Sequence, residues 1–261
     1  MLELEHTREL LIEMGLVSSA ALLDARLEAA AKGELTYLSF LSGLLDAERQ
    51  HRTRRSEEVR IKLSRLPHRK TLEEFDFTFQ PSIDARQVKE LATLAFAARK
   101  ENIILLGPPG VGKTHLAVGL CMQALRAGLT VYYATLPQLI ADLKKAEQIG
   151  KLERRMKAYL RTNILVVDEV GYMQLDRQAA ELLFRIVCER YETGSIILTS
   201  NKFFTNWGEL MSDTVIATAM LDRLLHHAHV INIRGETYRL KDRAKAGFVT
   251  VPQAAIHPVV L

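Results

Sequence analysis

The sequence contains little of several features that would place it in a special class. Its two cysteines, Cys121 and Cys188, are too few and too far apart for a disulfide framework or a zinc site, so we interpret them as small hydrophobic side chains. No apolar run approaches the roughly 20 residues that a membrane-spanning helix needs. The acidic start of the chain has no signal-peptide pattern. We therefore expect a cytoplasmic protein with no membrane partner.

The totals are those of an ordinary globular chain. The 261 residues can form one large domain, or one of medium size and a small one. Apolar residues make up 48% of the chain and charged residues 25%, which indicates a substantial core. A formal net charge of +4 permits a nucleic-acid partner but does not point to one. The distribution of charge is more informative.

Charge changes sign within the first 70 residues. Residues 1–48 carry three basic and nine acidic side chains, with apolar residues at helical spacing, and predict a small all-helical module. Residues 49–70 carry nine basic and two acidic side chains beside an apolar stripe, and predict a basic amphipathic helix that ends at Pro67. Its basic face either contacts DNA or is a solvated surface that offsets the acidic module. The DNA-contact candidates here are Arg49, Arg52, Arg54 and Arg55.

A glycine-rich loop at residues 107–114 is the most specific pattern. An apolar strand at 102–106 precedes it and a helix opens at Lys113, which is the context that a phosphate loop requires. Glycines let consecutive N–H groups curl around a phosphate, and the helix N-terminus adds positive potential. Lys113 would reach the β- and γ-phosphates of ATP, and the Thr114 hydroxyl would bind Mg²⁺. The predicted nucleotide-binding residues are Gly107, Pro108, Pro109, Gly110, Val111, Gly112, Lys113, Thr114 and His115.

Strands alternate with helices through the rest of the chain, which is typical of an α/β fold with a parallel sheet. Further strands are expected at 130–134, 164–168, 195–199 and 230–233. Helices are expected at 84–99, 136–161 and 177–191. The stretch 136–161 has seven basic and three acidic residues. It supplies the further DNA-contact candidates Lys144, Lys145, Lys151, Arg154 and Arg155.

Polar side chains end two of these strands. Asp168 lies 54 residues beyond Thr114 (168 minus 114), and would help to hold Mg²⁺. Glu169 would orient and polarise the attacking water as the catalytic base, so its presence predicts hydrolysis. Asn201 ends the next strand, where it would either point at the γ-phosphate or cap a turn.

Two arginines and three histidines complete the candidates. Arg223 lies among apolar residues at a helix end, and would either act on the γ-phosphate, often of a neighbouring subunit, or pair with Asp222 at the surface. Arg239 is a second arginine candidate. His226, His227 and His229 are interpreted as structural, because no further metal ligand is apparent.

Together these motifs resemble the AAA+ ATPases of the DnaC/IstB type. The resemblance covers roughly residues 70 to 240 and rests on four segments: 107–114, 165–169, 199–201 and 222–224. The N-terminal stretches 33–41 and 66–77 are more similar to the IstB transposition helpers than to helicase loaders. The resemblance implies a helical N-terminal domain with a basic linker helix at 1–66, an AAA+ domain at 67–245 and a tail at 246–261.

The resemblance also implies a function and residue roles. The expected protein is an ATP-dependent homo-oligomer that binds duplex DNA, mostly without sequence specificity, and assists a transposase in insertion. By motif position Asn201 would be sensor 1, Arg223 the arginine finger and Arg239 sensor 2, and 137–161 an inserted helical element that contacts nucleic acid. Only 22 residues follow Arg239, too few for a helical lid, so Arg239 either acts from the core or is not sensor 2. The alternatives are a helicase loader on single-stranded DNA and a DNA-binding scaffold with a structural nucleotide.

Overall fold

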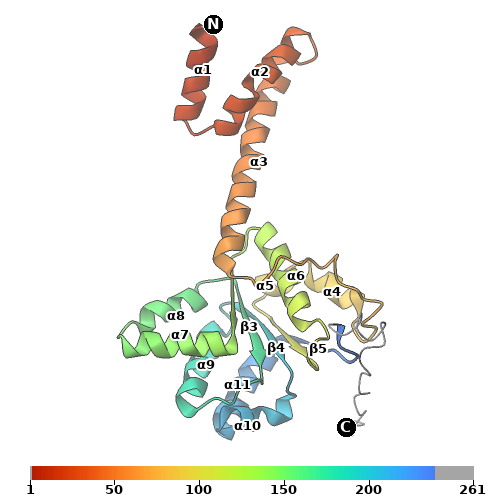
Figure 1. The fold of residues 1–261 in the computed structure, drawn as a ribbon, viewed down its shortest axis with the longest axis vertical. Helices are drawn as coiled ribbons and strands as arrows, with labels where there is room; N and C mark the ends of the chain where they lie inside the picture. Colours follow the sequence, from red (N-terminus) through yellow and green to blue (C-terminus); the bar gives the residue numbers. More distant parts are fainter. Residues whose placement is uncertain (1, 239–261) are drawn as a thin grey trace, which may run out of the picture. The chain divides into compact units, whose positions relative to one another are not determined.

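The structure, a computed structural model, describes residues 2–238, so Arg239 and the expected tail 246–261 lie outside the described residues. The chain divides into two compact units, Met1–Val59 and Arg60–Leu261. Figure 1 shows the order of the elements along the chain. None of the described helices combines the length and apolar character that crossing a bilayer requires.

The first unit is all-helical, as the apolar spacing predicted. It contains α1 (Leu2–Glu13), α2 (Val17–Ala31) and the start of α3 (Tyr37–Ser64), with Gly15 and Gly33 in the left-handed region between them. Its core is small, and the Glu48 carboxylate is buried in it, where it accepts hydrogen bonds from the Ser18 N–H at 2.9 Å and from Arg52 Nε at 3.0 Å. Many apolar side chains of this unit remain exposed.

The basic stretch does not form a helix of its own. It continues α3, which runs unbroken from the acidic module through the change of charge to Ser64. The helix ends at Ser64, slightly before the predicted end at Pro67, because Arg65 already adopts a left-handed conformation with φ of 59°.

The second unit is built on a five-stranded sheet in which every pair of neighbouring strands is parallel. The strand order is β2-β3-β4-β1-β5. The strands are β1 (Asn102–Leu106), β2 (Val131–Thr135), β3 (Ile164–Val170), β4 (Ser195–Ser200) and β5 (Ala228–Asn232). The prediction of a parallel α/β sheet is confirmed. Most of the expected strand ends differ from the observed ends by one or two residues.

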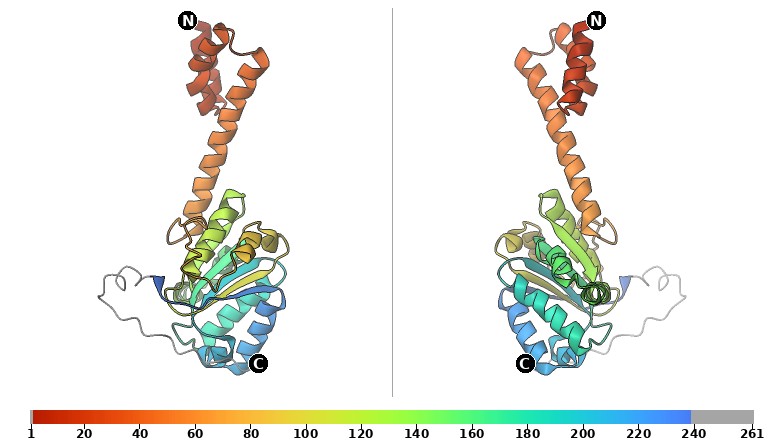
Figure 2. Two further views of the ribbon diagram at one scale, coloured as in Figure 1. Left: turned by 90° about the vertical axis from the view of Figure 1, so that its right-hand side faces the viewer. Right: turned by 90° about the vertical axis from the view of Figure 1, so that its left-hand side faces the viewer.

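Helices cover both faces of this sheet, as Figure 2 shows. One face packs against α4 (Ala85–Leu91), α5 (Ala95–Ala98) and α6 (Lys113–Arg126). The other packs against α7 (Leu136–Gln148), α8 (Leu152–Leu160), α9 (Arg177–Arg190), α10 (Trp207–Met211) and α11 (Thr214–His226). A short 3₁₀ turn, Phe204–Asn206, precedes α10. Successive strand residues alternate between the two cores, as in a sheet buried on both sides.

Two expected helices are each divided in two. The helix expected at 84–99 breaks at Leu94, whose φ of 65° is left-handed. The stretch expected as helical at 136–161 breaks at Gly150, which follows α7 with a φ of 65°. A residue with positive φ cannot continue a right-handed helix, so the backbone turns at each of these positions. The apolar periodicity of the sequence nevertheless continues across the turn. The second cysteine, Cys188 in α9, is half-buried, whereas Cys121 in α6 is fully buried.

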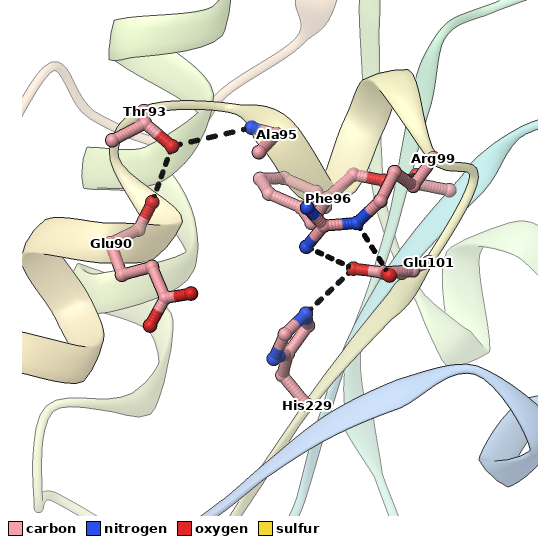
Figure 3. Close-up of polar contacts among 8 residues, drawn as sticks. Glu90, Thr93, Ala95, Phe96, Arg99, Glu101 and His229 are labelled. Carbon is pink, nitrogen blue, oxygen red and sulfur yellow. Dashed lines mark hydrogen bonds and ion pairs between the residues drawn. The ribbon is translucent and has the colours of Figure 1, made fainter.

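The edge strand β5 is attached through a charged cluster. Glu101, just before β1, accepts hydrogen bonds from Arg99 Nε at 2.7 Å and Nη2 at 2.9 Å, and lies 2.8 Å from His229 Nε2 on β5 (Figure 3). The contact with Arg99 lowers the pKa of Glu101 to about 2. The described end of the chain then passes the phosphate loop, since the Tyr238 N–H donates to Gly110 O at 2.9 Å.

Candidate functional site

The phosphate loop leaves the carboxyl end of β1, between β4 and β5. Its first residue, Gly107, donates its N–H to Ser200 O at the end of β4 over 3.1 Å. Gly107 has a φ of 152°, and a Cβ there would lie 2.4 Å from Ile233 O. Gly112 has a φ of 98°, and its Cβ would lie 2.6 Å from the Phe75 ring. Both positions therefore require glycine on conformational and steric grounds.

Lys113 opens α6 and turns back over the loop. Its side chain is buried, and Nζ donates to Gly107 O and Pro108 O, each at 2.7 Å. The ammonium group thus lies inside the curve of the loop, where a phosphate would find both the cation and the N–H groups at the start of α6.

Asp168 lies across from the loop near the end of β3 and is the most heavily hydrogen-bonded carboxylate of the site. It is 2% exposed. Thr114 Oγ1 lies 3.1 and 3.0 Å from its two oxygens, Tyr133 OH donates to Oδ2 at 2.5 Å, and Thr199 Oγ1 donates to Oδ1. The two residues predicted to bind Mg²⁺ are therefore in contact. A hydroxyl and a carboxylate are the hard oxygen ligands that Mg²⁺ prefers, so the donor set fits this ion.

Glu169 stands in a strained position beside Asp168. The register between β3 and β4 shifts between Val167 and Val170, and Glu169 has a φ of 64°. Its N–H donates to Thr199 Oγ1 at 3.1 Å, and its side chain is exposed while both neighbours are buried. A left-handed glutamate is uncommon, and such strain is concentrated at functional sites. Here it turns the carboxylate out of the sheet at its carboxyl edge.

Asn201 follows β4 and lies against the loop after Glu169. Its N–H donates to Val170 O at 3.3 Å, and its Oδ1 is buried with no hydrogen-bond partner among the described residues. A Cβ on Gly171 would lie 2.3 Å from this oxygen. The amide group is thus held at the edge that carries Asp168, with an acceptor left unused.

Arg223 does not lie with these residues. The next residue, Leu224, accepts a hydrogen bond at 3.1 Å from Asn102, the first residue of β1, whereas the phosphate loop follows the last. Arg223 Nη1 donates to Ala219 O at 3.0 Å, and its guanidinium lies 5.2 Å from the centre of the Phe184 ring. The length of a strand therefore separates this arginine from the phosphate loop of its own chain.

The family of the chain follows from comparison with known sequences. The family described as IstB-like ATP binding protein matches residues 10–246. The chain belongs to this family. An ATP-binding protein of insertion sequence IS21 from Pseudomonas aeruginosa is 54% identical over 228 residues, covering 87% of this chain and 86% of that protein. That of insertion sequence IS5376 from Geobacillus stearothermophilus is 49% identical over 220 residues, covering 84% and 88%.

Solved structures confirm the AAA+ fold of this IstB-like chain. DnaI superposes with a TM-score of 0.53 at 20% identity, over 67% of this chain and 92% of DnaI. AMPPCP-bound DnaA from Aquifex aeolicus superposes with a TM-score of 0.54 at 20% identity, over 72% of this chain and 59% of that chain. At this identity the likeness is one of fold.

The basic candidates of the IstB-like chain fall into two groups. Some are engaged within their own unit: Arg49 with Asp46, Arg52 with Glu48, Lys144 with Asp176, and Arg155 with Asp142, Tyr132 and Tyr159. The others are exposed, with no ion pair or side-chain hydrogen bond among the described residues: Arg54, Arg55, Lys145, Lys151 and Arg154. The second group is better suited to bind an external phosphate.

The histidines are placed apart from the phosphate loop. His229 is bound to Glu101, and His226 lies 2.6 Å from Tyr191 OH. Glu192 comes within 4.8 Å of ligand atoms of His226 and His227, so one further group that could bind a metal ion lies beside these two histidines. All three of these side chains are exposed.

Sequence reasoning missed two residues of the site, Tyr133 and Thr199. Both direct a hydroxyl at Asp168 from the neighbouring strands β2 and β4. One signal was available, since a tyrosine in a buried strand needs a hydrogen-bond partner. The partner's identity depends on strand order, which no local pattern reveals.

Proposed function

We propose that this chain is an ATP-hydrolysing, DNA-binding AAA+ protein that assembles on duplex DNA and assists the transposase of an insertion sequence. The observation that carries the nucleotide part is the contact between Thr114 and Asp168 beside the phosphate loop. The insertion-sequence part rests on relatives that are named as ATP-binding proteins of insertion sequences.

In this proposal the phosphates of ATP lie in the loop 107–114. The N–H groups at the start of α6 would donate to them, and Lys113 would exchange its two loop carbonyls for phosphate oxygens. Magnesium, when bound, would supply neutralisation of phosphate charge. Thr114 would hold it directly, and Asp168 directly or through water.

Hydrolysis needs a base and an orienting group near the γ-phosphate. Glu169 is exposed at the edge of the sheet and would accept the proton of the attacking water as the oxygen–phosphorus bond forms. Asn201 lies at the same edge, and its amide group would orient this water. The bond to the leaving ADP breaks in line with the attack, and Lys113 stabilises the developing charge.

The enzyme claim is tested with Glu169→Gln. This change keeps the size of the side chain and removes its basicity, so steady-state ATP hydrolysis should fall by about a hundredfold or more while ATP binding persists. Turnover and binding of a fluorescent ATP analogue are measured with and without duplex DNA. Absence of turnover in the wild-type protein would overturn the claim and leave a scaffold with a structural nucleotide.

The DNA claim is tested by the salt dependence of binding. Replacing Arg54 and Arg55 by Gln should weaken binding to duplex DNA and reduce the slope of log K against log salt, by up to about 0.9 for each DNA phosphate that the variant no longer neutralises. The matched control replaces Arg49 and Arg52, which are paired within the chain. Equal effects of the two pairs would argue against a specific role for the unpaired arginines. In the second unit, replacing the unpaired Lys151 and Arg154 by Gln tests the salt dependence of binding in the same way.

The partner claim is tested by strand transfer. Addition of the protein and ATP to the transposase from the same insertion sequence should stimulate insertion into a target duplex. Capture of a replicative helicase on single-stranded DNA, with no effect on strand transfer, would instead support a helicase loader.

A further inference from the structure

Tyr133 occupies an unusual place for a core aromatic residue. It lies in the middle of β2 and is 7% exposed. Its hydroxyl donates to Asp168 Oδ2 at 2.5 Å, across the pair of strands β2 and β3. Phenylalanine would fill the same apolar space, so the hydroxyl itself calls for an explanation. An unpaired hydroxyl in a core destabilises the folded state, so a buried tyrosine is expected only where its hydroxyl meets a polar partner.

Asp168 is held from both sides of its strand. The sheet order places β2 on one side of β3 and β4 on the other. Tyr133 donates from β2 to Oδ2, and Thr199 donates from β4 to Oδ1. Each carboxylate oxygen is thus fixed by a residue on a rigid strand.

The third donor, Thr114, cannot supply the same support. Its oxygen lies 3.0 Å from Asp168 and belongs to the loop and helix that receive the phosphates. In the proposed nucleotide complex this hydroxyl would bind the metal, so its contact with Asp168 would change with occupancy of the site. The two strand hydroxyls are independent of that change.

We propose that Tyr133 is a positioning residue for magnesium: with Thr199 it clamps the Asp168 carboxylate in the orientation that the ion requires. This inference rests on the proposed function of the site as a magnesium–nucleotide site. Hydrogen bonds that orient a ligating carboxylate commonly contribute about 10–100-fold to metal affinity. The hydroxyl of Tyr133 therefore sets how much magnesium the site needs to bind ATP, without touching the nucleotide.

The adjacent Tyr132 provides a matched control. It is buried to nearly the same degree on the opposite face of β2, and its hydroxyl accepts a hydrogen bond from Arg155 at 2.7 Å. Tyr132→Phe and Tyr133→Phe thus each remove one hydroxyl from the same strand, and only the second hydroxyl contacts Asp168.

The experiment titrates magnesium at a fixed concentration of a fluorescent ATP analogue, for the full-length wild-type protein and both variants. Tyr133→Phe should raise the half-saturating magnesium concentration about tenfold. Its affinity for the analogue in EDTA should equal that of the wild type, which shows that the pocket is intact. Tyr132→Phe should change neither quantity. In an Asp168→Asn background, Tyr133→Phe should have no further effect on the magnesium requirement.

Two results would overturn the inference. An unchanged magnesium midpoint in Tyr133→Phe would show that the hydroxyl does not position the carboxylate. Loss of binding in EDTA as well would show a general defect of the pocket. Failure of the proposed function is distinguishable, because the wild-type protein itself would then bind the analogue without any dependence on magnesium.

Discussion

At the scale of single residues, Arg190 shows how the site depends on side chains far from it. The residue is 1% exposed, and its guanidinium meets no carboxylate among the described residues. Instead it donates to five backbone carbonyls between 2.8 and 3.2 Å, those of Tyr159, Leu160, Thr162, Asn163 and Ser195. Two of these carbonyls lie in the last turn of α8, and the other three lie where the chain enters β3 and β4. Arg190 thereby fixes the starts of the two strands whose far ends carry Asp168 and Asn201.

Removing this side chain should destabilise the second unit strongly. Arg190→Ala removes five hydrogen bonds to buried or part-buried carbonyls, so the free energy of unfolding should fall by about 3 kcal/mol or more. Arg190→Lys should recover only part of this free energy, because one ammonium group cannot reach all five acceptors. Urea unfolding followed by fluorescence of the single tryptophan, Trp207, which is buried in this unit, measures the change.

Arg185 supplies the control for this measurement. It lies on the same helix and pairs at the surface with Glu153 and Glu189. Arg185→Ala should therefore change the free energy of unfolding by about 1 kcal/mol or less. A decrease for Arg190→Ala no larger than this would show that the buried hydrogen bonds contribute little.

The sequence marked the residues at strand ends but not their partners across the sheet. Glycines, Lys113 and the Asp168–Glu169 pair stand in local patterns whose physical meaning is the same in any chain, so the phosphate loop and the end of β3 could be predicted. Arg190 reads as one more charge at a helix end, between an acidic and an aromatic neighbour. Its burial follows from how α9 packs against the start of the sheet, and no local pattern encodes that packing.

At the scale of elements, the edge strand β5 is joined to its neighbour by more than the backbone ladder. Glu101 binds both Arg99 and His229, and its pKa is lowered from 4.5 to about 2, chiefly by Arg99. A carboxylate with a lowered pKa stabilises the folded state above pH 4.5, and this contribution is lost as the pH falls towards 2. Because the cluster is partly open to solvent, we expect Glu101→Gln to cost about 1 kcal/mol at pH 7.

The free-energy cost of Glu101→Gln should only decrease as the pH falls. The difference between wild type and Glu101→Gln in urea unfolding should be roughly constant from about pH 7 to pH 5 and shrink as the pH falls from about 4.5 towards 2. Glu181→Gln, which breaks an exposed pair one turn apart with Arg177, is the control and should have little effect throughout. A difference that grows on acidification would contradict the assigned role of the carboxylate.

Element boundaries were harder to predict than element types, and for a physical reason. Helices were predicted at 84–99 and 136–161, and most of these residues are helical. The breaks at Leu94 and Gly150 depend on a single left-handed residue each. The spacing of the apolar residues continues across them, so periodicity alone could not locate either break. The opposite error occurred at α3: the change of charge suggested that a new helix begins, but a single helix continues through it.

At the scale of the whole molecule, Arg223 is separated from the other candidate site residues of its own chain. The other site residues gather at the carboxyl edge of the sheet: Lys113, Thr114, Asp168, Glu169 and Asn201. Arg223 lies at the opposite end, beside the start of β1, and packs on Phe184. If it stabilises the charge of phosphoryl transfer, it must do so for a second copy of the chain. The homo-oligomer that the family resemblance implies would provide that arrangement.

Mixing two inactive variants tests this arrangement directly. Arg223→Ala should bind ATP and lose hydrolysis by at least about tenfold, since it retains the loop and lacks the arginine. Glu169→Gln should also bind ATP without hydrolysing it, and it still supplies Arg223. In an equal mixture with random assembly, about a quarter of the interfaces combine the intact loop and Glu169 of the Arg223→Ala variant with the Arg223 of the Glu169→Gln variant. About a quarter of wild-type turnover should therefore return. Asp222→Ala, an exposed neighbour on the same helix, is the control and should leave turnover unchanged. If the mixture stays inactive while both variants co-assemble, Arg223 does not complete the site of a neighbouring subunit, and its packing on Phe184 is its main role.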